Sequence, residues 1–271
     1  MGSNDIPPPH ISPLVVPVAD RLLQIGGGLW TICYILLARE SFTSKSYGMP
    51  LLALASNLGW ELVYALLIAE APLEKFAFTV WLVIDIFIVY GFLVHGSNEW
   101  EGAPAVKKHL PWILLAFTAW FGLGHWAFAK WWIESGVSLK KGKWYNGVEG
   151  IDTTELGFWS AAVAQVILSV ASLCQLIVRQ HTGGVSWAIW GTRFLGTLIG
   201  LDMVYAWSWY AWREATEYFL NPFAIFLWST NVVCDLIYPF VFARIRRTER
   251  VLQDGRKAAG GNQSHTRRKI A

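Results

Sequence analysis

The sequence predicts an all-α protein, an integral membrane bundle of seven transmembrane helices. Its 271 residues are 54% hydrophobic and only 15% charged, whereas about a quarter of the residues in soluble domains are charged. Seven apolar stretches have about the 20 residues that a helix needs to cross a bilayer. Many of the 17 Trp residues fall near the ends of these stretches, where aromatic side chains gather at the membrane surface.

The predicted spans form one membrane domain with a polar segment at either end. We place the spans at residues 18–38, 48–69, 76–95, 110–130, 156–178, 187–207 and 218–242. Residues 1–17 are then a polar N-terminal segment, residues 18–243 the membrane domain, and residues 244–271 a basic tail that we expect to be disordered. No cleavable signal peptide is expected, because the proline-rich N-terminus has no basic region before an apolar core.

Basic residues predict the orientation of the bundle, because short cytosolic segments are rich in Lys and Arg. The tail is strongly basic, with Arg244, Arg246, Arg247, Arg250, Arg256, Lys257, Arg267, Arg268 and Lys269. We therefore expect a cytosolic C-terminus and a lumenal or extracellular N-terminus, with the endoplasmic reticulum as the expected membrane. Lys140, Lys141 and Lys143 would then be lumenal, which argues against this orientation. The net charge of +3 reflects topology, and no nucleic-acid partner is expected.

Two acidic residues lie deep inside predicted spans, Glu61 in the second and Asp235 in the seventh. Each follows an Asn by four residues, Asn57 and Asn231, which is about one helical turn. A carboxyl group is costly in the bilayer, so one that is present there is a functional-site hypothesis. The two Asn residues could orient the acids or hold helices together by hydrogen bonds. The acids themselves could be structural.

Polar and aromatic residues at helical spacing extend these acidic sites and add others. The candidate substrate-binding or orienting residues are Asn57, Trp60, Tyr64, Trp81, Asp85, Asp202, Trp228, Asn231 and Tyr238. Since lipid cannot satisfy polar groups, we expect these faces to meet in one interior cavity. The Trp side chains among them could instead be packing residues. Asp85 and Asp202 could instead be structural partners of Arg193 or His125.

Several kinds of chemistry lack their sequence motifs. Cys33, Cys174 and Cys234 lie far apart within predicted spans, so neither a zinc site nor a disulfide framework is indicated. The last span has no Lys for a retinal Schiff base, and neither H-E-x-x-H nor G-x-S-x-G occurs. There is no D-D-x-x-D or N-D-x-x-D cluster to hold magnesium around a diphosphate. Any acid catalysis would therefore come from isolated carboxyls.

Carboxyl groups among aromatic side chains suit one kind of acid chemistry. Burial favours the protonated form of a carboxyl, which could then act as a general acid. An aromatic face stabilises a developing cation by about 2 kcal/mol or more when desolvated. A dry cavity protects the cation from water. Together these parts describe a protonation-initiated carbocation cyclisation of an apolar substrate.

Six regions in fixed order carry a resemblance to a known family. They contain Y-G-M-P and N-L-G-W-E, then N-E-W-E-G-A-P, L-S-V-A-S-L-C-Q-L-I-V-R, W-G-T-R-F-L-G-T, C-D-L-I-Y-P-F and R-I-R-R-T-E. The sequence resembles the fungal integral-membrane terpene cyclases, which include the paspaline-type cyclases of indole diterpene pathways and the cyclases of meroterpenoid pathways. The matching stretches run from about residue 47 to residue 250. Each is weak alone, and their order on seven spans makes the resemblance specific.

The resemblance implies cyclisation of an epoxidised farnesyl or geranylgeranyl chain attached to an indole, another aromatic or a polyketide-derived group. The family's two acidic catalytic residues match Glu61 and Asp235, which would protonate the epoxide oxygen directly or through a bound water. Asn57 and Asn231 would orient them, Trp60 with other deep aromatics would shield the cation, and no metal or organic cofactor would be required. The substrate would be lipophilic, and a functional association with a prenyltransferase and a flavin epoxidase of the same pathway is suggested.

Two functions outside catalysis compete with this interpretation. Acids inside the membrane are also typical of a proton-coupled transporter, although the two halves of the chain show no internal repeat of the kind that many transporters have. A seven-helix receptor or sensor is a third possibility, which nothing in the loops or tail supports. Within the cyclase interpretation, the two acids could serve different steps. The segment 131–155 could cap the cavity or only cover the surface.

Overall fold

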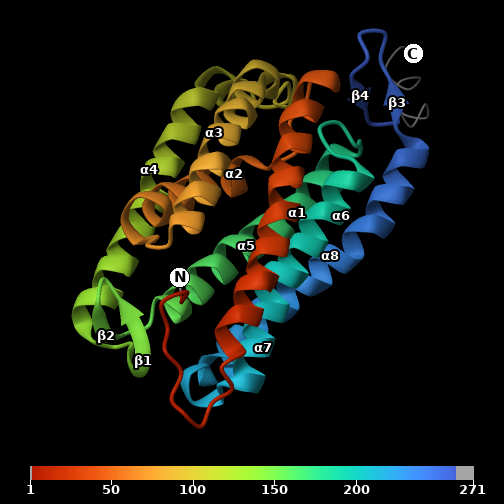
Figure 1. The fold of residues 1–271 in the computed structure, drawn as a ribbon. Helices are drawn as coiled ribbons and strands as arrows, with labels where there is room; N and C mark the ends of the chain where they lie inside the picture. The colour runs from red at the N-terminus through yellow and green to blue at the C-terminus, as the bar shows by residue number, and fades with distance from the viewer. Residues whose placement is uncertain (1, 261–271) are drawn as a thin grey trace, which may run out of the picture.

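Long helices run side by side through the molecule, and short two-stranded sheets lie near its two ends (Figure 1). The computed structural model describes residues 2–260. Its α-helices are α1 (Val15–Thr43), α2 (Leu51–Val63), α3 (Pro72–His95), α4 (Pro104–Ser135), α5 (Thr153–Arg179), α6 (Trp187–Thr197), α7 (Val204–Ala211) and α8 (Pro222–Thr248). Strand β1 (Leu139–Tyr145) pairs antiparallel with β2 (Val148–Ile151), and β3 (Arg250–Val251) with β4 (Lys257–Ala258). The predicted all-α membrane bundle is confirmed.

Shorter helical turns continue or join these helices. Two are π-helical: η1 (Tyr64–Ile68) continues α2, and η3 (Leu198–Met203) lies between α6 and α7. Three are 3₁₀ turns: η2 (Gly96–Glu99), η4 (Arg213–Ala215) and η5 (Glu217–Leu220). π-helical turns are rare and occur often at functional sites. Each of the two here lies next to a residue that the sequence singles out, because η1 begins three residues after Glu61 and η3 contains Asp202.

The sixth predicted span has a different construction from the others. Among the described residues, six helices are long and apolar enough to cross a membrane, and they correspond to the first five predicted spans and the seventh. The predicted span 187–207 lies on α6, η3 and α7, which follow one another without a gap. Arg193 and Asp202 make this stretch more polar, and the π turn interrupts its α-helical hydrogen bonding.

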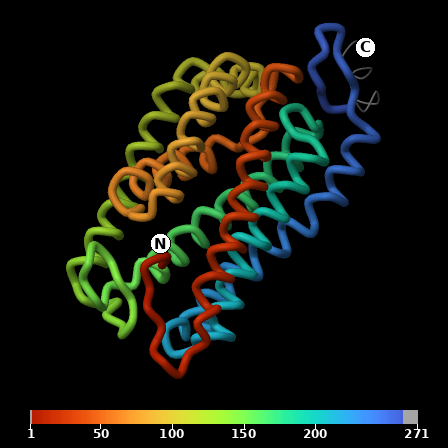
Figure 2. Tube along the Cα trace, viewed as in Figure 1, coloured from red at the N-terminus to blue at the C-terminus, as the bar shows by residue number. Residues whose placement is uncertain are grey.

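The helices pack in two groups that share α1. Helices α2, α3 and α4 lie on one side of α1, and α6, α7 and α8 lie on the other (Figure 2). Helix α1 contacts α3 in the first group and both α6 and α7 in the second. Helix α5 also joins the groups, because it packs against both α2 and α8. This arrangement places α5 between the helix that carries Glu61 and the helix that carries Asp235.

Glycines bring α1 close to the π turn η3. A Cβ atom built on Gly26 would lie 2.3 Å from the Cα atom of Gly200 and 2.8 Å from the carbonyl oxygen of Gly196. These are backbone atoms, which no side-chain rotation can move out of the way. Small residues at such contacts allow membrane helices to approach closely. The glycine contact therefore fixes η3 against α1.

Gly26→Ala is expected to destabilise the protein by about 1–3 kcal/mol, the usual cost of overpacking, because the added methyl group forces α1 away from η3. Gly28→Ala is the matched control, since a Cβ on Gly28 would meet no atom of the described residues within 4 Å. Alanine favours the helix at both positions, so that effect cancels in the comparison. Thermal unfolding in detergent measures the difference. Equal melting temperatures for the two variants would contradict the prediction.

The N-terminal segment and the β1–β2 hairpin together close one end of the bundle. Lys143 Nζ on β1 lies 2.7 Å from Asp5 Oδ2 in the N-terminal segment. It also lies 3.6 Å from Asp152 Oδ1 at the start of α5. Although burial opposes it, the carboxylates of Asp152 and Asp5 raise the pKa of Lys143. The segment 131–155 thus ends α4, forms the hairpin and begins α5.

The basic tail has defined structure as far as residue 260, which differs from the disorder predicted for residues 244–271. Helix α8 continues to Thr248, and strands β3 and β4 follow it. Lys257 Nζ donates to Thr182 Oγ1 (2.7 Å) and lies 3.3 Å from Glu249 Oε1. These contacts attach the beginning of the tail to the loop before α6. Residues 261–271, with the last three basic residues of the prediction, lie outside the described residues.

Candidate active site

Glu61 lies in a buried network made by α1, α2 and α3. Tyr34 Oη donates to Glu61 Oε1 (2.8 Å), and Asn57 Nδ2 donates to the same oxygen (3.0 Å). The Asn57 nitrogen also lies 2.8 Å from Tyr34 Oη and 3.4 Å from Asp85 Oδ2. Glu61 is 0% exposed and Asp85 is 1% exposed. The one-turn spacing of Asn57 and Glu61 thus appears in the structure as a direct hydrogen bond.

The two carboxyl groups of this network are close neighbours. Glu61 and Asp85 interact with each other both electrostatically and through their side-chain hydrogen-bonding groups. Over residues 2–260, no N–H or O–H donor reaches Glu61 Oε2 or Asp85 Oδ1. Two buried carboxylates side by side would repel each other, whereas one proton between them would supply the missing donor. The geometry is therefore suited to holding a proton inside the membrane.

Aromatic side chains form a wall beside this network. The rings of Trp60 and Tyr64 are stacked with centroids 4.8 Å apart, and Phe78 meets Trp60 edge-on at 5.3 Å. Trp81 follows, 5.5 Å from Phe78 and 5.8 Å from Tyr34. Both indoles are held by hydrogen bonds, because Trp60 Nε1 donates to a Ser hydroxyl of α5 (3.0 Å) and Trp81 Nε1 to a Thr hydroxyl of α1 (2.8 Å). The wall presents aromatic faces close to an acid.

Asp235 lies in a second buried network, made by α5, α6 and α8. Arg193 Nη2 on α6 forms an ion pair with Asp235 Oδ1. Ser169 Oγ on α5 lies 3.0 Å from Asp235 Oδ2 and 2.8 Å from Asn231 Oδ1. Gln165 Nε2 reaches the Asn231 oxygen at 3.4 Å. Asn231 is thus connected to Asp235 through Ser169, although the two lie one turn apart on the same helix.

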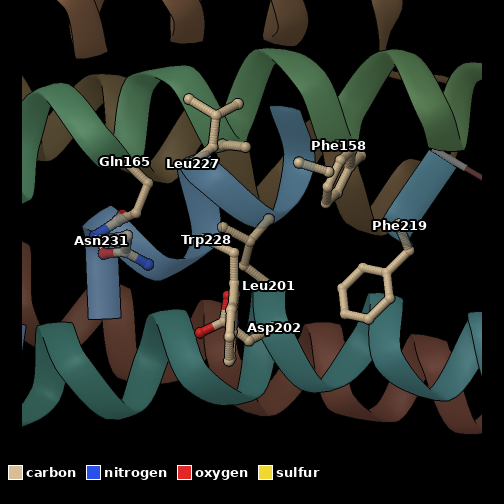
Figure 3. A pocket seen from close by; sticks show the side chains of 10 residues that line it. Phe158, Gln165, Leu201, Asp202, Phe219, Leu227, Trp228 and Asn231 are labelled. Carbon is tan, nitrogen blue, oxygen red and sulfur yellow. Dashed lines mark hydrogen bonds between the residues drawn. The ribbon is translucent and has the colours of Figure 1, made fainter. Parts of the chain in front are cut away.

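Asp202, Trp228 and Asn231 line a small pocket in the described part of the chain. The turn η3 supplies Asp202, and α8 supplies the other two side chains (Figure 3). The remaining lining residues are Phe158, Ala162, Gln165, Leu201, Phe219, Ala224 and Leu227. Most of this lining is apolar or aromatic, with polar groups gathered at one part. Such a lining is typical of a site for an apolar ligand that is oriented by a few polar contacts.

Comparison with known proteins identifies the family of this chain. Residues 3–248 match the family described as Pyr4-like transmembrane terpene cyclases. This chain belongs to that family. It is 47% identical over 253 residues to terpene cyclase ascF of Acremonium egyptiacum, an alignment that covers 93% of this chain and 91% of the relative. Terpene cyclase paxB of Penicillium paxilli is 32% identical over 242 residues, which cover 88% of this chain and 90% of the relative.

Other relatives carry names of the same kind. Terpene cyclase janB of Penicillium janthinellum is 31% identical over 244 residues, with 89% of this chain and 92% of the relative covered. No solved structure matches the chain. Membership in the Pyr4-like cyclases confirms the resemblance found in the sequence and makes the protein a membrane-bound terpene cyclase with a lipophilic substrate. In the described part of the chain, no three His, Cys, Asp or Glu side chains gather as they would around a metal ion.

Arg193 and His125, which the sequence suggested as partners of Asp85 and Asp202, have other neighbours in the structure of this Pyr4-like cyclase. Arg193 pairs with Asp235, and its guanidinium Cζ lies 5.1 Å from the ring centroid of Tyr238. His125 lies against the ring of Tyr64 on α2, with centroids 6.0 Å apart. Neither basic residue forms an ion pair with Asp85 or Asp202 among the described residues, so these two acids are not held by the partners suggested for them.

The two polar networks of the cyclase lie on different helices. Glu61 and Asp85 are not among the residues that line the pocket of Asp202, Trp228 and Asn231, and the single interior cavity expected from the sequence stays a prediction. Tyr238 lines another small pocket, together with Arg193. Helix α5 connects the regions, because Ser160 binds Trp60 and Ser169 binds Asp235.

The sequence reasoning missed Tyr34, Gln165 and Ser169 of these networks, and it suggested Asp85 or Asp202 as the partner of Arg193 in place of Asp235. Ser169 and Arg193 belong to two of the stretches that carry the family resemblance, L-S-V-A-S-L-C-Q-L-I-V-R and W-G-T-R-F-L-G-T, so a signal was present at both positions. Tyr34 lies in an apolar part of α1, where Thr31 is its one polar neighbour at helical spacing, so little in the sequence marks it. Its contact with Glu61 depends on how α1 packs against α2.

Proposed function

We propose that this Pyr4-like cyclase protonates the terminal epoxide of an epoxyprenylated aromatic, indole or polyketide-derived compound and directs a metal-independent carbocation cyclisation. The prenyl chain is farnesyl or geranylgeranyl, and the product is a polycyclic meroterpenoid or indole diterpene. One observation carries the proposal: the buried pair of Glu61 and Asp85, which one shared proton would satisfy, stands beside a wall of aromatic rings. The names of the relatives agree with the reaction class.

Glu61 is the proton donor in this proposal. Its proton passes to the epoxide oxygen, directly or through a bound water, while a C–O bond of the epoxide breaks. The oxygen becomes a hydroxyl group, the carbon becomes cationic, and the double bonds of the prenyl chain attack in turn. Tyr34 and Asn57 already donate to Glu61 Oε1, and donors of this kind stabilise the carboxylate that remains. The network therefore favours release of the proton.

The aromatic wall protects the cation after it forms. The stacked rings of Trp60 and Tyr64 belong to the wall that reaches the Glu61 network through Trp81 and Tyr34, and an aromatic face attracts a cation by about 2 kcal/mol or more in a desolvated site. Trp81 extends the wall toward Tyr34. Because Glu61 is fully buried, substrate binding requires that some of these rings move. The rings then replace water around the reacting chain, which prevents early capture of the cation.

Asp235 has a different part in this proposal. The sequence makes it a second proton donor, but in the structure its carboxyl group forms an ion pair with Arg193, whose guanidinium is always charged. We therefore assign Asp235 the task of positioning Arg193 and Ser169. Through Ser169 it also holds Asn231, which lines the pocket of Asp202 and Trp228. Trp228 and Tyr238 would contact substrate on the two sides of this network.

The cellular setting follows from the membrane bundle and the substrate. We propose the endoplasmic reticulum as the membrane and a cytosolic C-terminus, which the Lys and Arg residues of the tail support. A prenyltransferase has to attach the prenyl chain, and a flavin epoxidase has to oxidise its terminal double bond, before this enzyme acts. The intermediates are lipophilic, so association of these enzymes in one membrane would shorten their transfer.

Conversion of a defined substrate tests the proposal. Microsomes that contain the protein are expected to convert an epoxyfarnesyl or epoxygeranylgeranyl arene into a cyclic isomer of unchanged mass, at the same rate with and without EDTA. Microsomes that contain Glu61→Gln are the matched control. Loss of turnover on chelation would overturn the metal-independent mechanism. Absence of any cyclic product, together with solute uptake driven by a pH gradient, would favour a transporter instead.

A further inference from the structure

Asp202 is an acid without a basic partner in a pocket of aromatic and apolar side chains. It is 9% exposed and lines the pocket together with Phe158, Phe219 and Trp228 (Figure 3). Over residues 2–260, Asp202 forms no ion pair within 4.0 Å, and no Lys, Arg or His lines this pocket. The Asp202 carboxyl group interacts electrostatically with Asp235, which is itself paired with Arg193. The ion pairs of the described residues therefore leave the Asp202 carboxyl group without an opposite charge.

The backbone holds Asp202 in a fixed position. It lies in the π turn η3, where the extra residue of a π turn changes which side chains face a neighbouring helix. Gly200 of the same turn is pressed against Gly26 of α1, so the turn cannot shift easily. On the opposite side, Trp228 of α8 is a hydrogen-bonding neighbour of the carboxyl group. A residue held this way from two sides is positioned toward the pocket.

The electrostatics of this pocket favour a cationic occupant. A carboxylate among apolar side chains is costly unless an opposite charge pairs with it. No protein group that lines the pocket supplies that charge, as far as the structure is described. A carbocation in the pocket would supply it, and the rings of Phe158, Phe219 and Trp228 would attract the same cation. Aromatic rings cannot accept a proton, whereas a carboxylate can.

We propose that Asp202 is the base that ends the cyclisation. The proposal rests on the function proposed above and adds the group that receives the last proton. A C–H bond next to the final cationic carbon breaks, its electron pair forms the new C=C bond, and its proton goes to the Asp202 carboxylate. The epoxide oxygen gained one proton at the start and the carbon skeleton loses one at the end. The product is therefore an isomer of the substrate, and no oxidant or reductant is needed.

Product analysis of Asp202→Asn tests this role, because Asn keeps the shape of Asp but accepts no proton. Consumption of the epoxide is expected to continue, while the normal alkene product falls by about 10²-fold or more, the usual effect of losing a positioned general base. Water-captured alcohols and alkenes with the double bond elsewhere are expected to replace it. Asp202→Glu moves the carboxylate by one methylene and should restore an alkene with an altered double-bond ratio. Glu134→Gln, an exposed change at the end of α4, is the matched control.

The outcomes separate the two proposals. Wild-type product ratios from both Asp202→Asn and Asp202→Glu would overturn the role of Asp202 as the final base. Loss of epoxide consumption in a folded Asp202→Asn variant, checked by its melting temperature, would also overturn it and would place Asp202 in the first step. Failure of the proposed function looks different, because the wild-type protein would then yield no cyclic product or Glu61→Gln would consume the epoxide normally.

Discussion

Glu61→Gln is expected to abolish cyclisation while the protein remains folded. Gln has nearly the same shape as Glu and keeps an oxygen for the hydrogen bonds from Tyr34 and Asn57. Its amide cannot transfer a proton to an epoxide, and loss of a general acid costs about 10²–10⁴-fold in rate. The assay measures epoxide consumption as well as cyclic product, because both depend on the first proton transfer. Normal turnover by this variant would remove Glu61 from the mechanism.

Asp85→Asn tests which of the two neighbouring acids donates the proton. Asp85 stands next to Glu61 and shares Asn57 as a neighbour. If Glu61 is the donor, an amide at position 85 can hydrogen-bond to Glu61 but leaves its proton available. We therefore expect a smaller loss for Asp85→Asn than for Glu61→Gln. The reverse order would assign the proton to Asp85, and equal losses would show that the pair works only as a unit.

Hydropathy was enough to predict the membrane bundle, because the cost of exposing polar backbone in lipid leaves helices as the solution for long apolar stretches. Local spacing was also enough to place Asn57 beside Glu61. The sixth span shows the limit of this reasoning. Its π turn moves Asp202 relative to an ideal helix, and no pattern of residue types encodes that shift directly.

Contacts between helices could not be read from the sequence. The partners of Glu61 on α1 and α3 are set by how these helices rotate and slide against α2, and the same holds for Arg193 and Asp235. Asn231 is the clearest example. Its spacing predicts a direct contact with Asp235, yet a hydroxyl group of α5 lies between them. Short-range spacing thus placed the candidate acids and their Asn neighbours on their helices, while the partners on other helices depended on three-dimensional packing.

Arg193→Met and Asp235→Asn are each expected to lower the free energy of unfolding by about 3–5 kcal/mol, because each leaves a buried charge without its partner. Both residues are nearly inaccessible, with Arg193 6% exposed and Asp235 1% exposed. The double variant removes both charges and is expected to lose much less than the sum of the two single changes. Thermal unfolding in detergent and the yield of folded protein measure this coupling. Strictly additive losses would contradict the ion pair.

The same double variant decides between two roles for Asp235. If Asp235 is the charge partner of Arg193 and not a proton donor, a folded Arg193→Met/Asp235→Asn protein keeps measurable turnover, with a raised KM because Asn231 and the pocket are held less firmly. Glu61→Gln, equally folded, does not turn over. A double variant that folds fully but is as inactive as Glu61→Gln would place Asp235 among the proton donors. Folding and turnover therefore have to be measured on the same preparation, since each single change at Asp235 or Arg193 disturbs both.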